Sequence, residues 1–139
     1  MIDNDEIVMV GSGVRETLLD SPWWNRLFST IDSADARGFV EFLTADARFR
    51  FGNAAETVGS AAIAAAVTGF FAAIRSSKHS LRESWGAGAT GGCEGEVTYT
   101  RHDGSVVTFP FANVFRLRGD KICSYRIYID ISTLFSPPV

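Results

Sequence analysis

The last third of the chain alternates apolar and polar residues over long runs that are separated by turn sequences. Residues 106–117 and 122–131 are two such runs, and turn sequences at 102–105 and 118–121 precede them. Alternation of this kind is typical of β-strands with two different faces, and the Asp-Gly pair in the first turn favours a tight hairpin. We therefore expect an antiparallel sheet, whose apolar face another layer has to cover.

Helical periodicity dominates the first half of the chain. Ser21 and Pro22 have the chemistry of a helix start, and apolar residues then recur at helical spacing up to about residue 31. Asp32 or Ser33 can cap a second, short helix that ends by about residue 44. Ser60 can cap a third, alanine-rich helix. The three predicted helices cover residues 21–31, about 33–43 and 61–75.

Shorter strands and loops fill the rest of the chain. A strand is predicted at 48–51 and a loop at 52–59, while two further strands at 79–85 and 93–100 flank a glycine-rich connection. Residues 1–20 show no sustained period, and we expect them to form a flexible arm ahead of one domain at 21–139.

Composition excludes several functional classes. A chain of 139 residues fits one domain, and its net charge of -3 with scattered basic residues argues against nucleic acid and anionic membranes as partners. The N-terminus lacks the pattern of a signal peptide and no apolar run would span a bilayer, so we expect a cytoplasmic protein. Cys93 and Cys123 have no closely spaced ligand partner, and we expect reduced packing residues and neither a metal nor a cofactor.

Three segments carry a resemblance to a known family: FVEFLTADARFRFGN at 39–53, VGSAAI at 58–63 and, above all, NVFRLRGDKICSYRIYIDISTLF at 113–135. With the order of the predicted elements, they resemble the nuclear transport factor two-like, or SnoaL-like, superfamily over roughly residues 22–135. The resemblance implies an α+β fold, a cone-shaped barrel in which three N-terminal helices pack on a curved, mostly antiparallel sheet. It also implies a pocket on the concave face and a homodimer through the convex face.

The resemblance to polyketide cyclases and limonene-epoxide hydrolases implies that Asp130 points into the pocket. If it does, alternation turns Arg126 and Tyr128 inward with it. The predicted outward residues of this strand are then Tyr125, Ile127 and Ile129, whose apolar side chains suit a dimer face.

The hairpin through Asp103 and Gly104 suggests which residues of the two preceding strands share that inner face. The predicted inner residues are Glu94, Glu96, Thr98, Phe109, Phe111, Asn113 and Phe115, with Val97, Tyr99, Ala112 and Val114 facing the other way.

Asp130 is the first candidate for catalysis, because a carboxylate enclosed by aromatic walls has a raised pKa and becomes a better general base. Alternatively, Asp130 and Arg126 form a buried ion pair that closes the barrel. Asn113 lies where the resembled ketosteroid isomerases place an oxyanion donor, but it can instead satisfy strand or loop groups. Glu96, together with Glu94, can serve as an acid or base partner to Asp130, or can pair with Arg126 or lie at the pocket rim. The candidate catalytic residues are therefore Asp130, Asn113, Glu96 and Arg126.

Aromatic residues are expected to form the core and the pocket wall. The predicted substrate-binding residues are Trp23, Trp24, Phe28, Phe49, Phe51, Phe70, Glu94, Thr98, Phe109, Phe111 and Tyr128. The two imidazoles, His79 and His102, are left outside the catalytic set, since one starts a strand and the other lies in a turn.

These residues favour a general acid/base enzyme of the isomerase, cyclase or hydrolase type that acts on a small apolar, polyketide- or terpene-like molecule without a cofactor. The steroid isomerase and epoxide hydrolase patterns are incomplete here, because Phe49, Arg50 and Phe51 occupy positions where those enzymes carry polar groups. The alternative is a non-catalytic module of the same fold that binds a ligand, dimerises or serves in assembly.

Overall fold

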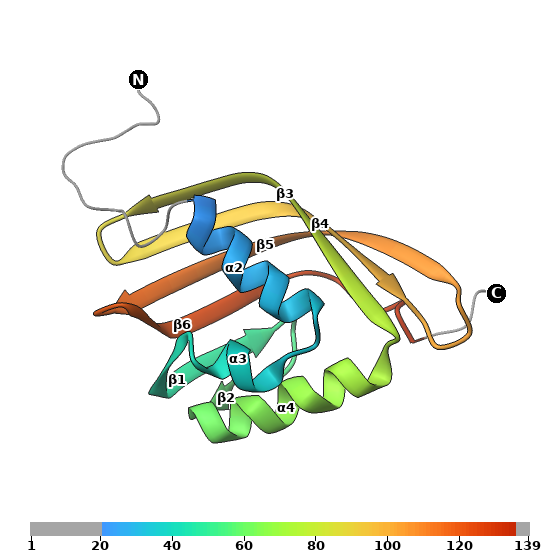
Figure 1. Ribbon diagram of the computed structural model, residues 1–139, viewed down its shortest axis with the longest axis horizontal. Coiled ribbons are helices and arrows are strands. Elements are labelled where there is room, and N and C mark those ends of the chain that lie inside the picture. Colours follow the sequence, from blue (N-terminus) through green and yellow to red (C-terminus); the bar gives the residue numbers. More distant parts are fainter. Residues whose placement is uncertain (1–20, 136–139) are drawn as a thin grey trace.

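The computed structural model describes residues 21–135, and the predicted arm at 1–20 lies outside them. Three helices and six strands form an α+β fold of two layers (Figure 1). The helices are α2 (Ser21–Asp32), α3 (Ala36–Val40) and α4 (Ser60–Ala73), and the strands are β1 (Leu43–Phe51), β2 (Thr57–Val58), β3 (Ser76–Ala87), β4 (Thr90–Thr100), β5 (Val106–Arg118) and β6 (Lys121–Tyr128). None of the helices in this part of the chain is long and apolar enough to cross a membrane.

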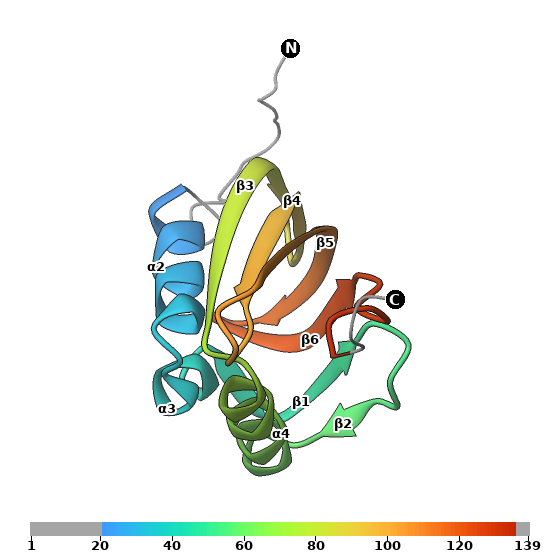
Figure 2. The same ribbon diagram turned by 90° about the vertical axis from the view of Figure 1, so that its right-hand side faces the viewer.

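The sheet has the strand order β2-β1-β6-β5-β4-β3. All neighbours are antiparallel except β1 and β6, which run parallel and join the first strand to the last. The sheet curves without closing, and the helices lie on its concave side, which gives the cone shape that the sequence predicts (Figure 2). The predicted α+β fold is therefore confirmed.

Helix α2 covers the sheet because one of its sides is strongly apolar. Trp23, Trp24, Leu27 and Phe28 recur at helical spacing and are all buried. The ring of Trp24 stacks on Phe115 of β5 with centroids 5.2 Å apart. Each fully buried large side chain contributes about 1.5–3 kcal/mol, so this side of the helix fixes the helix to the sheet.

The element boundaries differ from the predicted ones where side chains have other partners. Neither Asp32 nor Ser33 caps α3; the carboxylate of Asp35 does so by accepting from the N–H of Gly38 at 2.9 Å. The last strand ends at Tyr128, so Asp130 follows the strand and the predicted alternation does not reach it. Strand β2 replaces part of the predicted loop.

A β-bulge distorts β3 where it passes Gly95 of β4, between Leu81 and Glu83. At Gly95, an added Cβ would collide with backbone atoms of Ser80 and Leu81. The bulge bends β3 around the helix layer, and only glycine permits the two backbones to approach this closely.

We expect Gly95→Ala to lower the free energy of unfolding by about 2 kcal/mol, since backbone atoms of β3 would have to move. Gly69→Ala in α4 is the matched control: an added Cβ meets nothing within 4 Å there. It should stabilise the protein by up to about 1 kcal/mol through helix propensity. Denaturant unfolding of both variants measures the contrast, and equal stabilities would contradict the close approach.

Candidate functional site

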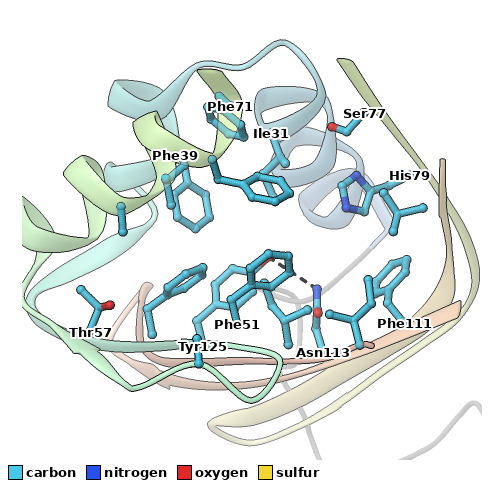
Figure 3. Close-up of a pocket in the computed structure, with 18 of the residues that line it drawn as sticks. Ile31, Phe39, Phe51, Thr57, Phe71, Ser77, His79, Phe111, Asn113 and Tyr125 are labelled. Carbon is cyan, nitrogen blue, oxygen red and sulfur yellow. Dashed lines mark hydrogen bonds between the residues drawn. The ribbon is translucent and has the colours of Figure 1, made fainter. Parts of the chain in front are cut away.

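A cavity of about 290 Å³ lies between the helices and the concave face of the sheet (Figure 3). Its wall is almost entirely apolar and is rich in aromatic rings from every layer of the fold. The lining residues are Ile31, Phe39, Phe49, Phe51, Ala54, Ala55, Thr57, Ala66, Val67, Phe70, Phe71, Ser77, His79, Val97, Tyr99, Phe111, Asn113, Tyr125, Ile127 and Ile129. A volume of this size suits a small organic molecule.

His79 is the titratable base on this wall, and it is bound to Asp32 at the end of α2. His79 Nδ1 lies 2.6 Å from Asp32 Oδ1. The backbone N–H of His79 donates to Asp32 Oδ2 at 2.8 Å, and the hydroxyl of Ser77 donates to Asp32 Oδ1 at 2.9 Å. One carboxylate thus holds three donors of β3 and fixes the imidazole in place.

Burial raises the pKa of Asp32, but the hydrogen bonds from His79 and Ser77 and the charge interaction with His79 outweigh it. The resulting pKa lies below the ordinary value of 3.8. Asp32 is therefore ionised near neutral pH and can only accept hydrogen bonds. Nδ1 of His79 must then carry the proton, which leaves Nε2 as the basic nitrogen.

Two phenylalanines enclose the His79 ring. The ring centroid of Phe28 lies 4.7 Å from that of His79, and the ring centroid of Phe111 lies 5.3 Å away. The imidazole is 11% exposed, and no residue within 21–135 hydrogen-bonds its Nε2. Figure 3 shows the ring reaching from β3 into the cavity. Nε2 is thus available to a molecule in the pocket.

Asn113 supplies an amide to the cavity floor from β5. It is 1% exposed, its Nδ2 donates to the hydroxyl of Tyr125 over a long 3.5 Å, and its Oδ1 has no hydrogen-bond partner among the described residues. A buried polar atom without a partner costs about 1–3 kcal/mol. Such a cost at a pocket wall marks Asn113 as a candidate group for ligand binding.

Two tyrosines add hydroxyl groups to the same wall. Burial, together with the negative charge of Asp32, raises the pKa of Tyr99 above its ordinary value. Burial, assisted by charge interactions with Cys93, Tyr99 and Asp32, does the same for the pKa of Tyr125. Both phenols stay protonated near neutral pH, so they can donate hydrogen bonds. The hydroxyl of Tyr99 has no hydrogen-bond partner within residues 21–135.

Part of the predicted site lies together in this cavity. Asn113 and four of the predicted wall residues line it: Phe49, Phe51, Phe70 and Phe111. Four others, Trp23, Trp24, Phe28 and Phe109, are buried in the surrounding core and do not line the cavity.

The predicted inner faces of β4 and of the last strand are wrong. Tyr125, Ile127 and Ile129 line the cavity, so Arg126 and Tyr128 point away from it. Asp130 is exposed, and hydrogen bonds from the backbone and side chain of Ser132 hold the pKa of its carboxyl below the ordinary value. The general base predicted at this position therefore has neither the burial nor the raised pKa on which that prediction depended.

The same inversion applies to β4. Val97 and Tyr99 line the cavity, whereas Glu94, Glu96 and Thr98 lie on the opposite face of the sheet. The hydroxyl of Thr98 bonds there to that of Thr108 on β5 at 2.9 Å. The catalytic or binding roles predicted for Glu94, Glu96 and Thr98 thus lose their place at the pocket.

Sequence reasoning missed the pair of Asp32 and His79, which lie 47 positions apart and meet only through the packing of α2 on β3. A weak signal was present: His79 begins an alternation with Leu81 in which both are expected on the covered face. Tyr99 and Tyr125 were missed because their strands were assigned the wrong face.

Metal ligands are not grouped in this part of the molecule: within residues 21–135 no three His, Cys, Asp or Glu side chains lie close enough to hold an ion. Cys93 of β4 is buried and pairs with Asn113 of β5, and burial raises the pKa of its thiol to about 12. The thiol therefore stays protonated and is a packing group.

Residues 24–125 match the family model of the SnoaL-like domain. This match covers more than half of the chain, so the chain belongs to the SnoaL-like family. No functionally curated protein matches it in sequence.

Solved structures with low sequence identity share the fold. A protein with a ketosteroid isomerase-like fold from Catenulispora acidiphila, in complex with trimethylamine, has 16% identity and a TM-score of 0.74 over 81% of this chain and 88% of that one. A putative SnoaL-like polyketide cyclase from Jannaschia has 18% identity and a TM-score of 0.71, covering 83% and 90%. TerC, co-crystallised with polyporic acid, has 15% identity and a TM-score of 0.70, covering 80% and 91%.

We expect Asp32→Asn to lower the free energy of unfolding by about 2 kcal/mol near neutral pH, because a charged acceptor of three hydrogen bonds becomes neutral. The folded-state pKa of Asp32 is depressed, so its contribution is present above 3.8 and is lost as pH falls through the folded-state value. The stability gap between wild type and variant should therefore shrink in acid. Denaturant unfolding at a series of pH values measures this stability difference. A difference that widens in acid would contradict the role of Asp32 as an ionised acceptor.

Proposed function

We propose that the protein is an acid/base enzyme in which His79 moves a proton on a small apolar carbonyl compound. The observation that carries the proposal is the hydrogen-bonded pair of His79 and Asp32 at the wall of an aromatic cavity. Isomerisation, cyclisation and elimination all begin with such a transfer. The pair takes the place of the exposed Asp130 in this mechanism.

His79 acts as the general base through Nε2. The nitrogen takes a proton from the carbon next to the carbonyl group, and the electron pair of that C–H bond moves into the carbonyl to form an enolate. The new imidazolium then lies beside the carboxylate of Asp32, whose charge stabilises it. Return of the proton to the same or another carbon completes the cycle and regenerates the neutral imidazole.

Hydrogen-bond donors near the enolate oxygen complete this mechanism. The donors of the wall that are best suited are the hydroxyl of Tyr99 and Nδ2 of Asn113, since both residues are buried and Nδ2 makes only a long 3.5 Å hydrogen bond to Tyr125. Donors fixed in a water-poor cavity stabilise a developing negative charge more strongly than water-exposed ones. A substrate therefore has to place its carbonyl oxygen at these groups and its acidic carbon at His79.

The substrate class follows from the wall. Aromatic rings favour a flat or cyclic apolar body, and among residues 21–135 no arginine or lysine lines the cavity to pair with an anion. Burial is the main cause of the raised pKa of both tyrosines, and the negative charge of Asp32 adds to it. We therefore propose a neutral or amine-bearing ring compound. A structure of this fold was solved in complex with trimethylamine, which is a small amine.

The second candidate is a non-catalytic module that binds a small apolar molecule. The specific observation in its favour is the small number of polar groups on the wall, where Ser77, His79, Tyr99, Asn113, Tyr125 and Thr57 stand among apolar side chains. Binding would then use the cavity, and His79 and Asp32 would only join α2 to β3.

Exchange of carbon-bound protons tests the base directly. In D₂O, the wild type should accelerate deuterium uptake next to the carbonyl group of 1-indanone or 2-tetralone, as followed by proton NMR. His79→Gln should lower this acceleration about 10²-fold or more, because general-base catalysis contributes 10²–10⁴-fold.

Asp130→Asn is the matched control and should keep the wild-type rate, since that carboxylate is exposed and lies outside the cavity wall. Calorimetric titration of the same ketones measures binding separately. Ketones that bind without any exchange would favour the binding module, and equal exchange by wild type and His79→Gln would reject His79 as the base.

Ligand charge is a second test. Phenyltrimethylammonium should bind about tenfold more tightly than benzenesulfonate, because aromatic faces and the field of Asp32 attract a cation and repel an anion. Neutral tert-butylbenzene, which has the shape of the cation, separates charge from size. Asp32→Asn should narrow the difference in affinity between the cation and the anion. Calorimetry or thermal shift measures it, and tighter binding of the anion would contradict the assigned field.

A further inference from the structure

The two ends of the cavity differ in their exposure to solvent. Figure 3 shows His79, Phe111 and Asn113 toward one end of the cavity and Thr57 toward the other. At the first end, Phe111 is 5% exposed and Asn113 is 1% exposed, so the wall that carries these groups is closed to solvent. A ligand that uses His79 and Asn113 therefore has to enter from the end at which Thr57 lies.

Three alanines form the open end of the cavity. Ala54 and Ala55 belong to the loop between β1 and β2, and Ala66 belongs to α4. All three line the cavity and are also exposed, which marks the place where the cavity reaches the surface. We call the opening between these three residues the mouth. Their side chains are small and apolar, and among residues 21–135 no charged side chain lines the cavity there.

The loop at the mouth is tied to the sheet on both sides. Nε of Arg50 on β1 donates to the carbonyl oxygen of Ala54 at 3.1 Å. Gly52 packs against the segment that follows β6, where an added Cβ would stand 3.1 Å from the carbonyl oxygen of Ile129. Ile129 itself lines the cavity, although the sequence predicted it on a dimer face. The sheet thus fixes the position of the mouth.

An exposed phenylalanine extends the apolar wall beyond the cavity. Phe135 is 56% exposed, and its ring centroid lies 6.3 Å from that of Phe70, which lines the cavity from α4. The preceding residue, Leu134, is fully buried, and Nε of Arg101 donates to its carbonyl oxygen at 2.8 Å. The ring of Phe135 is therefore held beside the cavity wall and open to solvent. A ring in this position is suited to packing against an apolar group.

The size of the cavity limits what it can enclose. Pockets for drug-sized ligands measure about 300–1,000 Å³. The cavity of about 290 Å³ lies just below this range, so it encloses one small ring compound. A longer molecule has to extend through the mouth. An uncharged, apolar extension is favoured there, because contact with alanine and phenylalanine side chains removes apolar surface from water.

We propose that the substrate is a ring ketone with an apolar chain opposite its carbonyl group, and that the chain passes through the mouth and packs on Phe135. The inference rests on the function proposed above, which places the carbonyl oxygen at Tyr99 and Asn113. The reverse orientation would press the chain against the closed end and leave both donors without the carbonyl oxygen. The small side chains at the mouth therefore determine specificity, because they admit the chain.

Alkylated acetophenones test this orientation. Calorimetry should show that the wild type binds para-butylacetophenone at least tenfold more tightly than acetophenone, because each fully buried methylene adds about fourfold. ortho-Butylacetophenone should bind no more tightly than acetophenone, since its chain lies beside the carbonyl group and meets the closed end. Equal affinities for the two butyl isomers would overturn the proposal.

Two variants test the mouth itself. Ala66→Trp should abolish the tighter binding of the para-butyl compound relative to acetophenone, because the indole fills the opening. Phe135→Ala should reduce this advantage about threefold and leave acetophenone binding unchanged, since only the chain reaches that ring. Ala65→Trp is the matched control: it makes the same change at an exposed position of α4 that does not line the cavity, and should keep the wild-type advantage. An advantage that survives both Ala66→Trp and Phe135→Ala would overturn the proposal.

His79→Gln separates this proposal from the proposed reaction. The variant should lose deuterium exchange but retain the preference for the para-butyl compound, since His79 lies at the end away from the mouth. A wild type that prefers the para-butyl compound and catalyses no exchange would reject the acid/base function and leave the role of the mouth intact. Exchange without that preference would reject the role of the mouth alone.

Discussion

The carboxylate of Asp32 joins the two layers of the fold at the point where the cavity is most polar. It belongs to the last turn of α2, and its three hydrogen bonds all come from β3. Because β3 is one of the two edge strands of the sheet, it has only one strand neighbour, and its position depends on α2. The contact that fixes the edge strand is therefore the contact that orients His79, so stability and chemistry rest on the same group.

The fold could be predicted from the sequence to a large extent because its signals are local. Hairpin turns, alternating strands and apolar helix stripes depend on neighbours in the chain, and all three helices and the four long C-terminal strands lie where these signals place them. Boundaries depend on tertiary partners and were less predictable. Asp32 illustrates this, since a residue suited to a helix cap hydrogen-bonds to a strand 45 to 47 positions away.

The candidate site could be predicted only where the face of a strand was assigned correctly. A strand alternates with period two, so an error of one position exchanges every inner residue for an outer one. The inner face of β5 was correct because its aromatic residues alternate without ambiguity. On β6 the assignment was anchored on Asp130, although the apolar alternation of Tyr125, Ile127 and Ile129 gives the face that the structure has.

Burial energetics explain why the apolar pattern is the better guide. Placing Glu94, Glu96 and Arg126 against the helix layer would require three charges to leave water, at a cost of several kcal/mol each without well-formed partners. Turning Val97, Tyr99 and Tyr125 inward instead gains roughly 1.5–3 kcal/mol for each large apolar side chain. Few polar groups are tolerated inside, and the most deeply buried amide among the described residues is Asn113 on β5.

The two faces of the sheet are consequently under different constraints. The inner face has to keep polar groups few and fixed, because each one without a partner destabilises the fold. The outer face has no such limit, and charges can accumulate on it next to exposed rings. Val114 and Asn113 are adjacent in β5, yet one is open to solvent and the other is buried beside the cavity. Backbone hydrogen bonds to β4 and β6 hold both, so a change in how this strand pairs would alter the pocket and the outer surface together.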